Sequence, residues 1–275
     1  MRRLHAAGVL ALLAAAALVA PVLAGPAPAP APASVSAAPA AGPAPSAAEV
    51  PIALRHCAYT EVPVRVLPQD LDPLVPDDFV IRISTGLATV NLGAGRCGEA
   101  ESGADVGAAN FAFLLARIEE PEDPALLGPG VGIYFYRLEH LTMADDVYAR
   151  AAQAAGVDRI VVDVIDVQVQ DLLTAMSIEG AGRSYSLTLP LAVPGVGAGP
   201  WGQGAHWREY HAVEGGYAYL DAHLWSGDGG QTMPGVLQIE GGLAGEVYGP
   251  VNAGLTIFGT DAAVLDGQMG IVPYP

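Results

Sequence analysis

Short runs of β-branched and aromatic residues, separated by Pro, Asp or Gly, follow one another after residue 49. The first three are Val62 to Val66, Phe79 to Ile83 and Leu87 to Leu92. Because such residues favour strands and the separators favour turns, each run predicts a short β-strand. The same pattern predicts later strands at Arg159 to Val169, with a bulge at Val164-Ile165, at Ser184 to Val193, and between Val236 and Phe258.

Two runs, Asn110 to Ile118 and Val131 to Leu138, are longer and apolar at nearly every position. A strand with apolar side chains on both faces is typical of a barrel wall or a sandwich core. His206 to Ala212 and Tyr217 to Trp225 flank Glu214-Gly215-Gly216, which predicts a hairpin. The pattern therefore predicts a mainly β protein of the α+β class, built on an antiparallel sheet or barrel.

One segment has apolar residues at helical spacing, so the sheet is expected to carry one or a few short helices. Thr142 with Asp145 three residues later resembles a capping box, and Gly156 suits the position just after a helix. We therefore expect a helix from Thr142 to the residue before Gly156. Its apolar positions are Ala144, Val147, Tyr148, Ala151, Ala154 and Ala155.

The first residues have the pattern of an export signal. Arg2 and Arg3 precede an apolar run from Ala6 to Ala20, and Val22 and Ala24 suit a cleavage site after residue 24. We predict a signal peptide over residues 1–24, after whose removal no membrane span remains. The alternative is a retained N-terminal anchor, because an Ala-rich run of this length can span a bilayer marginally.

Residues 25–48 consist almost entirely of Ala, Pro and Ser. Such a stretch cannot bury a core, so it predicts a disordered, extended linker. Residues 49–275 are left for the β-barrel domain. Together these features predict a secreted protein, extracellular or in the cell envelope.

Charge and composition exclude several functions. The 275 residues carry a formal net charge of −17, which repels nucleic acid. The 12 residues counted as lysine or arginine are all arginine, so no lysine is present for a Schiff base or a Walker phosphate loop. A G-x-S-x-G nucleophile elbow does not occur either.

Cysteine usage fits an oxidising compartment. Cys57 and Cys97 are the only two cysteines. A disulfide between them would close a loop of about 40 residues and stabilise the fold by roughly 4 kcal/mol. The alternative is a pair of free buried thiols.

Several motifs resemble the acetoacetate-decarboxylase-like superfamily. Val62 to Leu92, VPVRVLPQDLDPLVPDDFVIRISTGLATVNL, is similar to that group's opening strand, its "lPxxLxPLVPxxF" link and its first barrel wall. NFAFLLAR at Asn110 to Arg117 lies where the family has a cavity-lining strand. GIYFYRLEH at Gly132 to His140 is similar to the family's "GvyFfsLd" strand, and a short helix and a glycine follow, as in the family.

This resemblance implies a closed antiparallel β-barrel with a mostly apolar cavity. It does not carry over the family's chemistry, because the lysine that acts there as Schiff-base nucleophile is missing. Arg159 or Ile160 occupies the matching position in this sequence. Arginine stays protonated and cannot form an imine.

Five residues are candidates for contacts with a ligand. Arg159 suits a carboxylate, or else pairs with a surface acid. Arg117 ends an apolar strand and lies at a cavity wall or at a solvated strand end. Tyr134 and Tyr136 share one face and either orient a ligand or lie in the core. Glu139, next to His140, is a weak acid–base candidate.

A weaker hypothesis is a metal site on the predicted hairpin. Glu209 and His211 share a strand face, and His223 would join them from the paired strand. The alternative is that these residues lie at the rim of an amphipathic hairpin. No cofactor is expected from the sequence.

The predicted function is therefore the binding, or the transformation, of a small apolar or keto-acid-like ligand without a Schiff-base lysine. Whether the protein is an enzyme, and its oligomeric state, stay open at this point. The alternative is a non-enzymatic envelope or surface module on an Ala-Pro tether, with an exposed patch around Trp201, Trp207 and Trp225.

Overall fold

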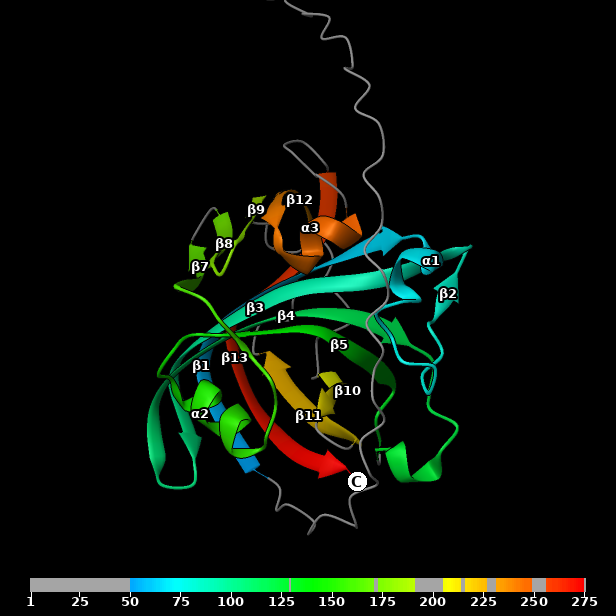
Figure 1. Ribbon diagram of the computed structural model, residues 1–275. Coiled ribbons are helices and arrows are strands. Elements are labelled where there is room, and N and C mark those ends of the chain that lie inside the picture. The colour runs from blue at the N-terminus through cyan, green and yellow to red at the C-terminus, as the bar shows by residue number, and fades with distance from the viewer. Residues whose placement is uncertain are drawn as a thin grey trace, which may run out of the picture. The chain divides into compact units, whose positions relative to one another are not determined.

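A curled β-sheet forms most of the protein (Figure 1). The computed structural model describes residues 50–128, 130–170, 173–190, 205–213, 216–226, 231–248 and 256–274. The predicted signal peptide, residues 1–24, and the predicted linker, residues 25–48, lie outside the described residues.

Thirteen strands, three α-helices and one 3-10 turn are assigned within the described residues. The strands are β1 (Val50–Val66), β2 (Ile83–Ser84), β3 (Leu87–Ser102), β4 (Asp105–Ile118), β5 (Ile133–Thr142), β6 (Ile160–Val161), β7 (Val164–Gln170), β8 (Leu173–Gly180), β9 (Arg183–Pro190), β10 (Ala205–Val213), β11 (Gly216–Ser226), β12 (Gln231–Gly241) and β13 (Thr256–Tyr274). The helical elements are α1 (Pro68–Leu71), η1 (Pro124–Leu126), α2 (Val147–Ala154) and α3 (Gly242–Tyr248).

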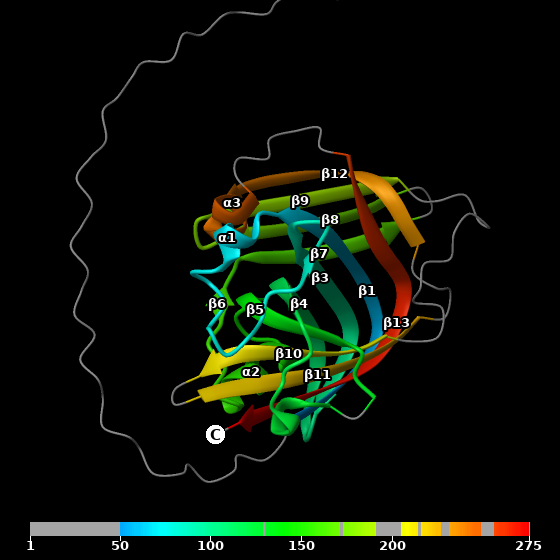
Figure 2. The ribbon, with the colours of Figure 1, turned by 90° about the vertical axis from the view of Figure 1, so that its right-hand side faces the viewer.

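The strands pair in the order β1-β3-β4-β5-β10-β11-β13-β12-β9-β8-β7, and β13 also pairs with β1. Figure 2 shows how this sheet curls from β12 and β9, through β13 and β1, to β10 and β11. The predicted antiparallel arrangement holds for most neighbours, but β5 pairs in parallel with β10 and with β6. The sheet is a curled half-barrel, with short helices as expected.

Both faces of the central strand β4 are buried, as its apolar pattern predicted. Ala112, Leu114 and Ala116 belong to one apolar core, which continues into β7, β8 and β9. Phe111 and Phe113 belong to a second core, which also contains side chains of α2, β10 and β11. Successive side chains of a strand point to opposite faces, so one strand contributes to both cores.

Two glycines in β3 make room for the aromatic rings of the second core. Gly95 pairs with Phe111, and Gly93 pairs with Phe113. A Cβ atom at Gly95 would lie 2.3 Å from the Phe111 ring, and one at Gly93 would lie 2.5 Å from the Phe113 ring. The rings therefore cover the backbone of β3, which requires glycine at these two positions.

The predicted helix exists, but it begins later than its sequence suggested. Asp146, not Thr142, is the N-cap, and its side chain accepts a hydrogen bond of 2.7 Å from the backbone N–H of Ala149. Thr142 is still part of β5, where it pairs with Phe111. Gly156 follows the helix with a φ of 73°, as predicted for a C′ glycine.

Several other predicted boundaries differ from the structure. Phe79 to Ile83 is mostly not a strand, since only a bridge at Ile81 and the two residues of β2 pair with neighbours. The single strand expected over Arg159 to Val169 is divided into β6, which pairs with β5, and β7, which pairs with β8. Strand β8 and helix α3 were not predicted.

The disulfide expected between Cys57 and Cys97 is present. The two cysteines face each other in the ladder between β1 and β3, and both are buried in the second core. The alternative of two free thiols is therefore excluded. No helix in the described part of the chain is long and apolar enough to cross a membrane.

Removing the disulfide as Cys57→Ala/Cys97→Ala should lower the free energy of unfolding by about 4 kcal/mol, because the unfolded chain regains the entropy of an open loop. Urea unfolding measures the change. Dithiothreitol should shift the wild-type midpoint in the same direction and leave the variant unchanged. An unchanged wild-type midpoint after full reduction, checked by mass, would contradict this account.

Candidate functional site

A buried ion pair joins β5 to β10 inside the sheet. Arg137 donates through Nε to Glu209 Oε2 at 2.7 Å and also contacts that oxygen through Nη2. The side chains are only 2% and 1% exposed. Charged groups are stable at such depth only when they are paired and hydrogen-bonded, so each residue requires the other.

Two aromatic side chains complete the hydrogen bonding of this ion pair. Trp207 Nε1 donates to Glu209 Oε1 at 2.6 Å, and Arg137 Nη1 donates to the hydroxyl of Tyr148 in α2 at 3.2 Å. Burial alone would lower the pKa of Arg137, but Glu209 and Tyr148 together raise it above its ordinary value. Arg137 is therefore a fixed cation, and α2 is attached to the sheet through it.

A local irregularity of β5 brings His140 to the same face as Arg137. Leu115 pairs with Arg137 and Leu114 with Glu139, so Leu138 is an extra residue in β5. Strict alternation would place residues 137 and 140 on opposite faces, whereas a bulge of one residue reverses the faces beyond it. His140 consequently packs on Tyr148, with ring centroids 5.2 Å apart.

His211 of β10 completes the cluster. Its ring centroid lies 5.3 Å from that of His140. Neither nitrogen of His140 has a hydrogen-bond partner in the described structure, and nor does Nε2 of His211. Burial, followed by the charge of Arg137, lowers both histidine pKa values well below the usual range. Both imidazoles are neutral at neutral pH.

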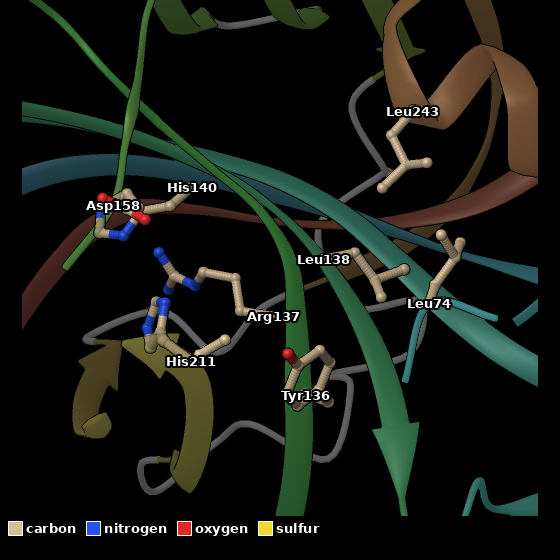
Figure 3. Close-up of a pocket in the computed structure, with 9 residues that line it drawn as sticks. Leu74, Tyr136, Arg137, Leu138, His140, Asp158, His211 and Leu243 are labelled. Carbon is tan, nitrogen blue, oxygen red and sulfur yellow. The ribbon is translucent and has the colours of Figure 1, made fainter. Parts of the chain in front are cut away.

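A pocket of about 250 Å³ opens beside these side chains. Its polar lining consists of Tyr136, Arg137, His140, Asp158 and His211, and its apolar lining consists chiefly of Leu74, Leu138 and Leu243. Figure 3 shows the nitrogen atoms of Arg137, His140 and His211 near one another, with Asp158 beside His140 and the leucines at the other side. The pocket thus suits a small molecule that has one polar and one apolar end.

The predicted ligand residue Glu139 is engaged elsewhere. It accepts hydrogen bonds from Arg183 Nη2 and from the Tyr185 hydroxyl, both at 3.1 Å, and from the backbone N–H of Leu243 at 3.3 Å. Burial and the charge of Glu139 raise the pKa of Tyr185 to about 12. Glu139 therefore fixes β9 and α3 to β5, and it does not line the pocket.

The structure places the other four predicted ligand residues apart. Tyr134 and Tyr136 share one face, as predicted, and both belong to the first core, but only Tyr136 also lines the pocket. Arg159 donates to Gln153 at 3.0 Å outside the pocket lining. Arg117 lies near the end of β4 and also outside the pocket lining.

The predicted metal residues are not brought together. Strands β10 and β11 pair as a hairpin, and the register places His223 opposite His206. Glu209 and His211 lie on the other face of β10, because residues an odd number apart alternate in direction. Within the described ranges, no group of three or more His, Cys, Asp or Glu side chains is arranged to hold a metal ion.

A second pocket, of about 520 Å³, is acidic and therefore unsuitable for an anionic ligand. Its lining includes Asp77, Asp78, Glu119, Glu120, Glu122 and Asp123. These carboxylates are negatively charged and repel an approaching anion. The smaller pocket has one carboxylate, that of Asp158, beside a buried arginine and two neutral histidines, so it is the better candidate for a keto-acid-like molecule.

Sequence reasoning missed the central residues of the cluster, Arg137 and Tyr148. A usable signal was present, because Arg137 interrupts the apolar run of β5, and an arginine inside a buried strand needs a partner. Trp207 was assigned to an exposed patch, but it is only 4% exposed and donates to Glu209. Trp201 and the side chain of Trp225 lie outside the described structure.

Comparison with known proteins gives a fold but no close relative. No protein-family model matches the sequence, and no curated protein matches it. Among solved structures, acetoacetate decarboxylase from Legionella pneumophila is 11% identical, with a TM-score of 0.55 over 82% of this chain and 87% of that chain.

Two further solved structures are similar at the same level. Another acetoacetate decarboxylase is 13% identical, with a TM-score of 0.52 over 82% of this chain and 89% of that one. The enduracididine biosynthesis enzyme MppR, complexed with the condensation product of pyruvate and imidazole 4-carboxaldehyde, is 12% identical, with a TM-score of 0.52 over 81% of this chain and 87% of that one. These similarities establish the fold alone.

The protein therefore has the acetoacetate-decarboxylase-like fold that its sequence motifs predicted. The similarity extends well beyond Val62 to Leu92 and the two further motifs that first indicated it.

The two buried histidines should make the protein less stable in mild acid. As the pH falls below about 6.5, the unfolded chain binds protons that the folded protein cannot, because both folded-state pKa values are lowered. Two such groups remove up to about 2.7 kcal/mol of stability per pH unit. Urea unfolding of wild type and of His140→Gln/His211→Gln is measured at pH 7.5, 6.5 and 5.5. The free energy of unfolding of the wild type should fall relative to that of the variant as the pH is lowered, so the difference between the two should narrow. A difference that does not change with pH would contradict the conclusion that both histidines are neutral in the folded protein.

Proposed function

We propose that the protein binds a small keto-acid-like molecule in the pocket beside the Arg137–Glu209 ion pair. The observation that carries this proposal is the set of buried ring nitrogens of His140 and His211 that have no protein partner. Buried polar atoms are nearly always hydrogen-bonded, so these nitrogens favour a ligand that supplies the missing partners.

The chemistry of the pocket limits the ligand. A neutral imidazole carries one N–H donor and one acceptor nitrogen, so the two rings suit a molecule with carbonyl and hydroxyl or carboxyl groups. Arg137 adds a positive potential, although Glu209 offsets its charge. The volume of about 250 Å³ and the three leucines favour a short apolar chain attached to that polar group.

A Schiff base does not belong to this proposal, because the sequence contains no lysine. The step that the lining residues do offer is proton transfer. A neutral His140 or His211 can accept a proton from a bound hydroxyl or carbon acid and return it. Catalysis by these residues would therefore be acid–base chemistry on a non-covalently bound molecule.

Strand pairing, the disulfide and the burial of Trp207 bear on the rest of the proposal, namely the barrel, the location of the protein and the alternative function. Strand β1 pairs with both β3 and β13, which supports a closed barrel around the second core. The Cys57–Cys97 disulfide supports export to an oxidising compartment, outside the cell or in its envelope, since disulfides persist there. The tethered surface module is less well supported, because Trp207 is buried and contributes to no exposed patch.

The proposal predicts saturable binding of a short-chain keto acid that depends on His211. Isothermal titration with pyruvate and longer 2- and 3-keto acids measures it. His211→Gln should weaken the tightest of these at least tenfold, because one polar partner is lost. His206→Gln, an exchange of the same kind outside the pocket, should change the affinity less than twofold.

Circular dichroism of both variants verifies that they are folded. Failure of every keto acid to bind at millimolar concentration, or equal affinity of wild type and folded His211→Gln, would overturn the proposed function.

A further inference from the structure

Three arginines have no protein acceptor among the described residues, and they lie together. Of the twelve arginines in the sequence, Arg2 and Arg3 lie outside the described residues. Seven of the others donate to an acidic or amide side chain. These seven are Arg55, Arg96, Arg137, Arg150, Arg159, Arg183 and Arg208. The remaining three are Arg65, Arg82 and Arg117, which form no ion pair or side-chain hydrogen bond with any described residue.

The sheet register aligns these three residues in one row. Arg65 of β1 pairs with Thr89 of β3, and the pairing of Val90 with Ala116 places Thr89 opposite Arg117 of β4. On the side of β4 that faces β3, where β2 also pairs with β3, Ile81 bridges Ile118, and the backbone N–H of Arg82 donates to the carbonyl oxygen of Arg117 at 3.0 Å. Arg82 is thus the direct neighbour of Arg117.

Residues opposite each other in antiparallel strands project from the same face. The three arginine side chains therefore share one face of the sheet. Adjacent strands lie about 4.8 Å apart, so the backbones of Arg65 and Arg117 are separated by roughly 10 Å, which two extended arginine side chains can span. One small ligand between them is within reach of all three guanidinium groups.

The three guanidinium groups repel one another, although solvent screens Arg65 and Arg82, which are exposed, more than the half-buried Arg117. Like charges directly opposite each other destabilise a sheet. Burial lowers the pKa of Arg117, and the charges of Arg82 and Arg65 lower it further, while Glu119 and Glu61 act in the opposite sense. The Nε atom of Arg117 is buried without a partner. In a protein with a net charge of −17, acids are abundant, yet none forms an ion pair with this row among the described residues.

We propose that Arg65, Arg82 and Arg117, hereafter the arginine row, form a binding site for a small oxyanion with two or more negative charges. A phosphate group and a dicarboxylate share this chemistry. The planar guanidinium fork matches the oxygen pairs of either group, and an anion would relieve the repulsion within the row. None of the three arginines lines the keto-acid pocket, so this inference is independent of the proposed function.

The test compares two triple variants that remove the same charge. Arg65→Gln/Arg82→Gln/Arg117→Gln removes the arginine row. Arg55→Gln/Arg96→Gln/Arg150→Gln removes three exposed arginines that have acidic partners. The melting temperature of each protein is measured against the concentration of phosphate, sulfate or succinate, with sodium chloride at equal ionic strength as the reference.

At least one of the three anions should raise the melting temperature of the wild type and of the control variant in a saturable manner. The apparent affinity should fall at least tenfold in the arginine-row variant. Preference for phosphate and sulfate would identify a phosphate-type ligand, and preference for succinate a dicarboxylate. The proposal would be overturned if the anions raised the melting temperature of all three proteins equally. It would also be overturned if no anion stabilised the wild type more than sodium chloride does.

Discussion

The ion pair between Arg137 and Glu209 lies inside the curled sheet, where both side chains are almost completely shielded from bulk solvent. Each is stable there only because the other is present, and because Trp207 and Tyr148 supply the remaining hydrogen bonds. The pair therefore fixes β5 against β10 and holds α2 over the same interior. The charge of Arg137 also contributes to keeping His140 neutral, so the chemical state of the pocket depends on the same contact.

Because of the extra residue in β5, neighbouring residues of this strand contact two different parts of the interior. Before the bulge, Tyr136 lies in the first core and Arg137 faces the second core. After it, Glu139 contacts Arg183 and Tyr185, while His140 joins Arg137. Glu139 and His140 are adjacent and chemically suggestive as a pair, but they point to opposite faces and serve different sites. A structural carboxylate and a ligand-facing imidazole thus follow each other directly.

Local patterns predicted the parts of the fold that depend on local physics. The apolar runs located β4 and β5, the glycine at position 156 located the end of α2, and the only two cysteines formed the disulfide. What the sequence did not show depended on tertiary contacts, chiefly on pairing between distant strands. The parallel contact of β5 with β10, the start of α2 at Asp146 and the opposite facing of His223 follow from register and tertiary contacts, which a single sequence does not encode locally.

A double-mutant cycle on the ion pair tests this account most directly. The substitutions Arg137→Met and Glu209→Gln are made separately and together, and the free energy of unfolding of each variant is measured in urea at pH 7.5. Each single variant leaves a buried charge alone, so we expect losses of about 3 to 5 kcal/mol. The double variant leaves no charge, so its loss should be smaller than the sum of the single losses by about 2 to 3 kcal/mol. Losses that add to within about 0.5 kcal/mol would show that the pair does not organise the interior.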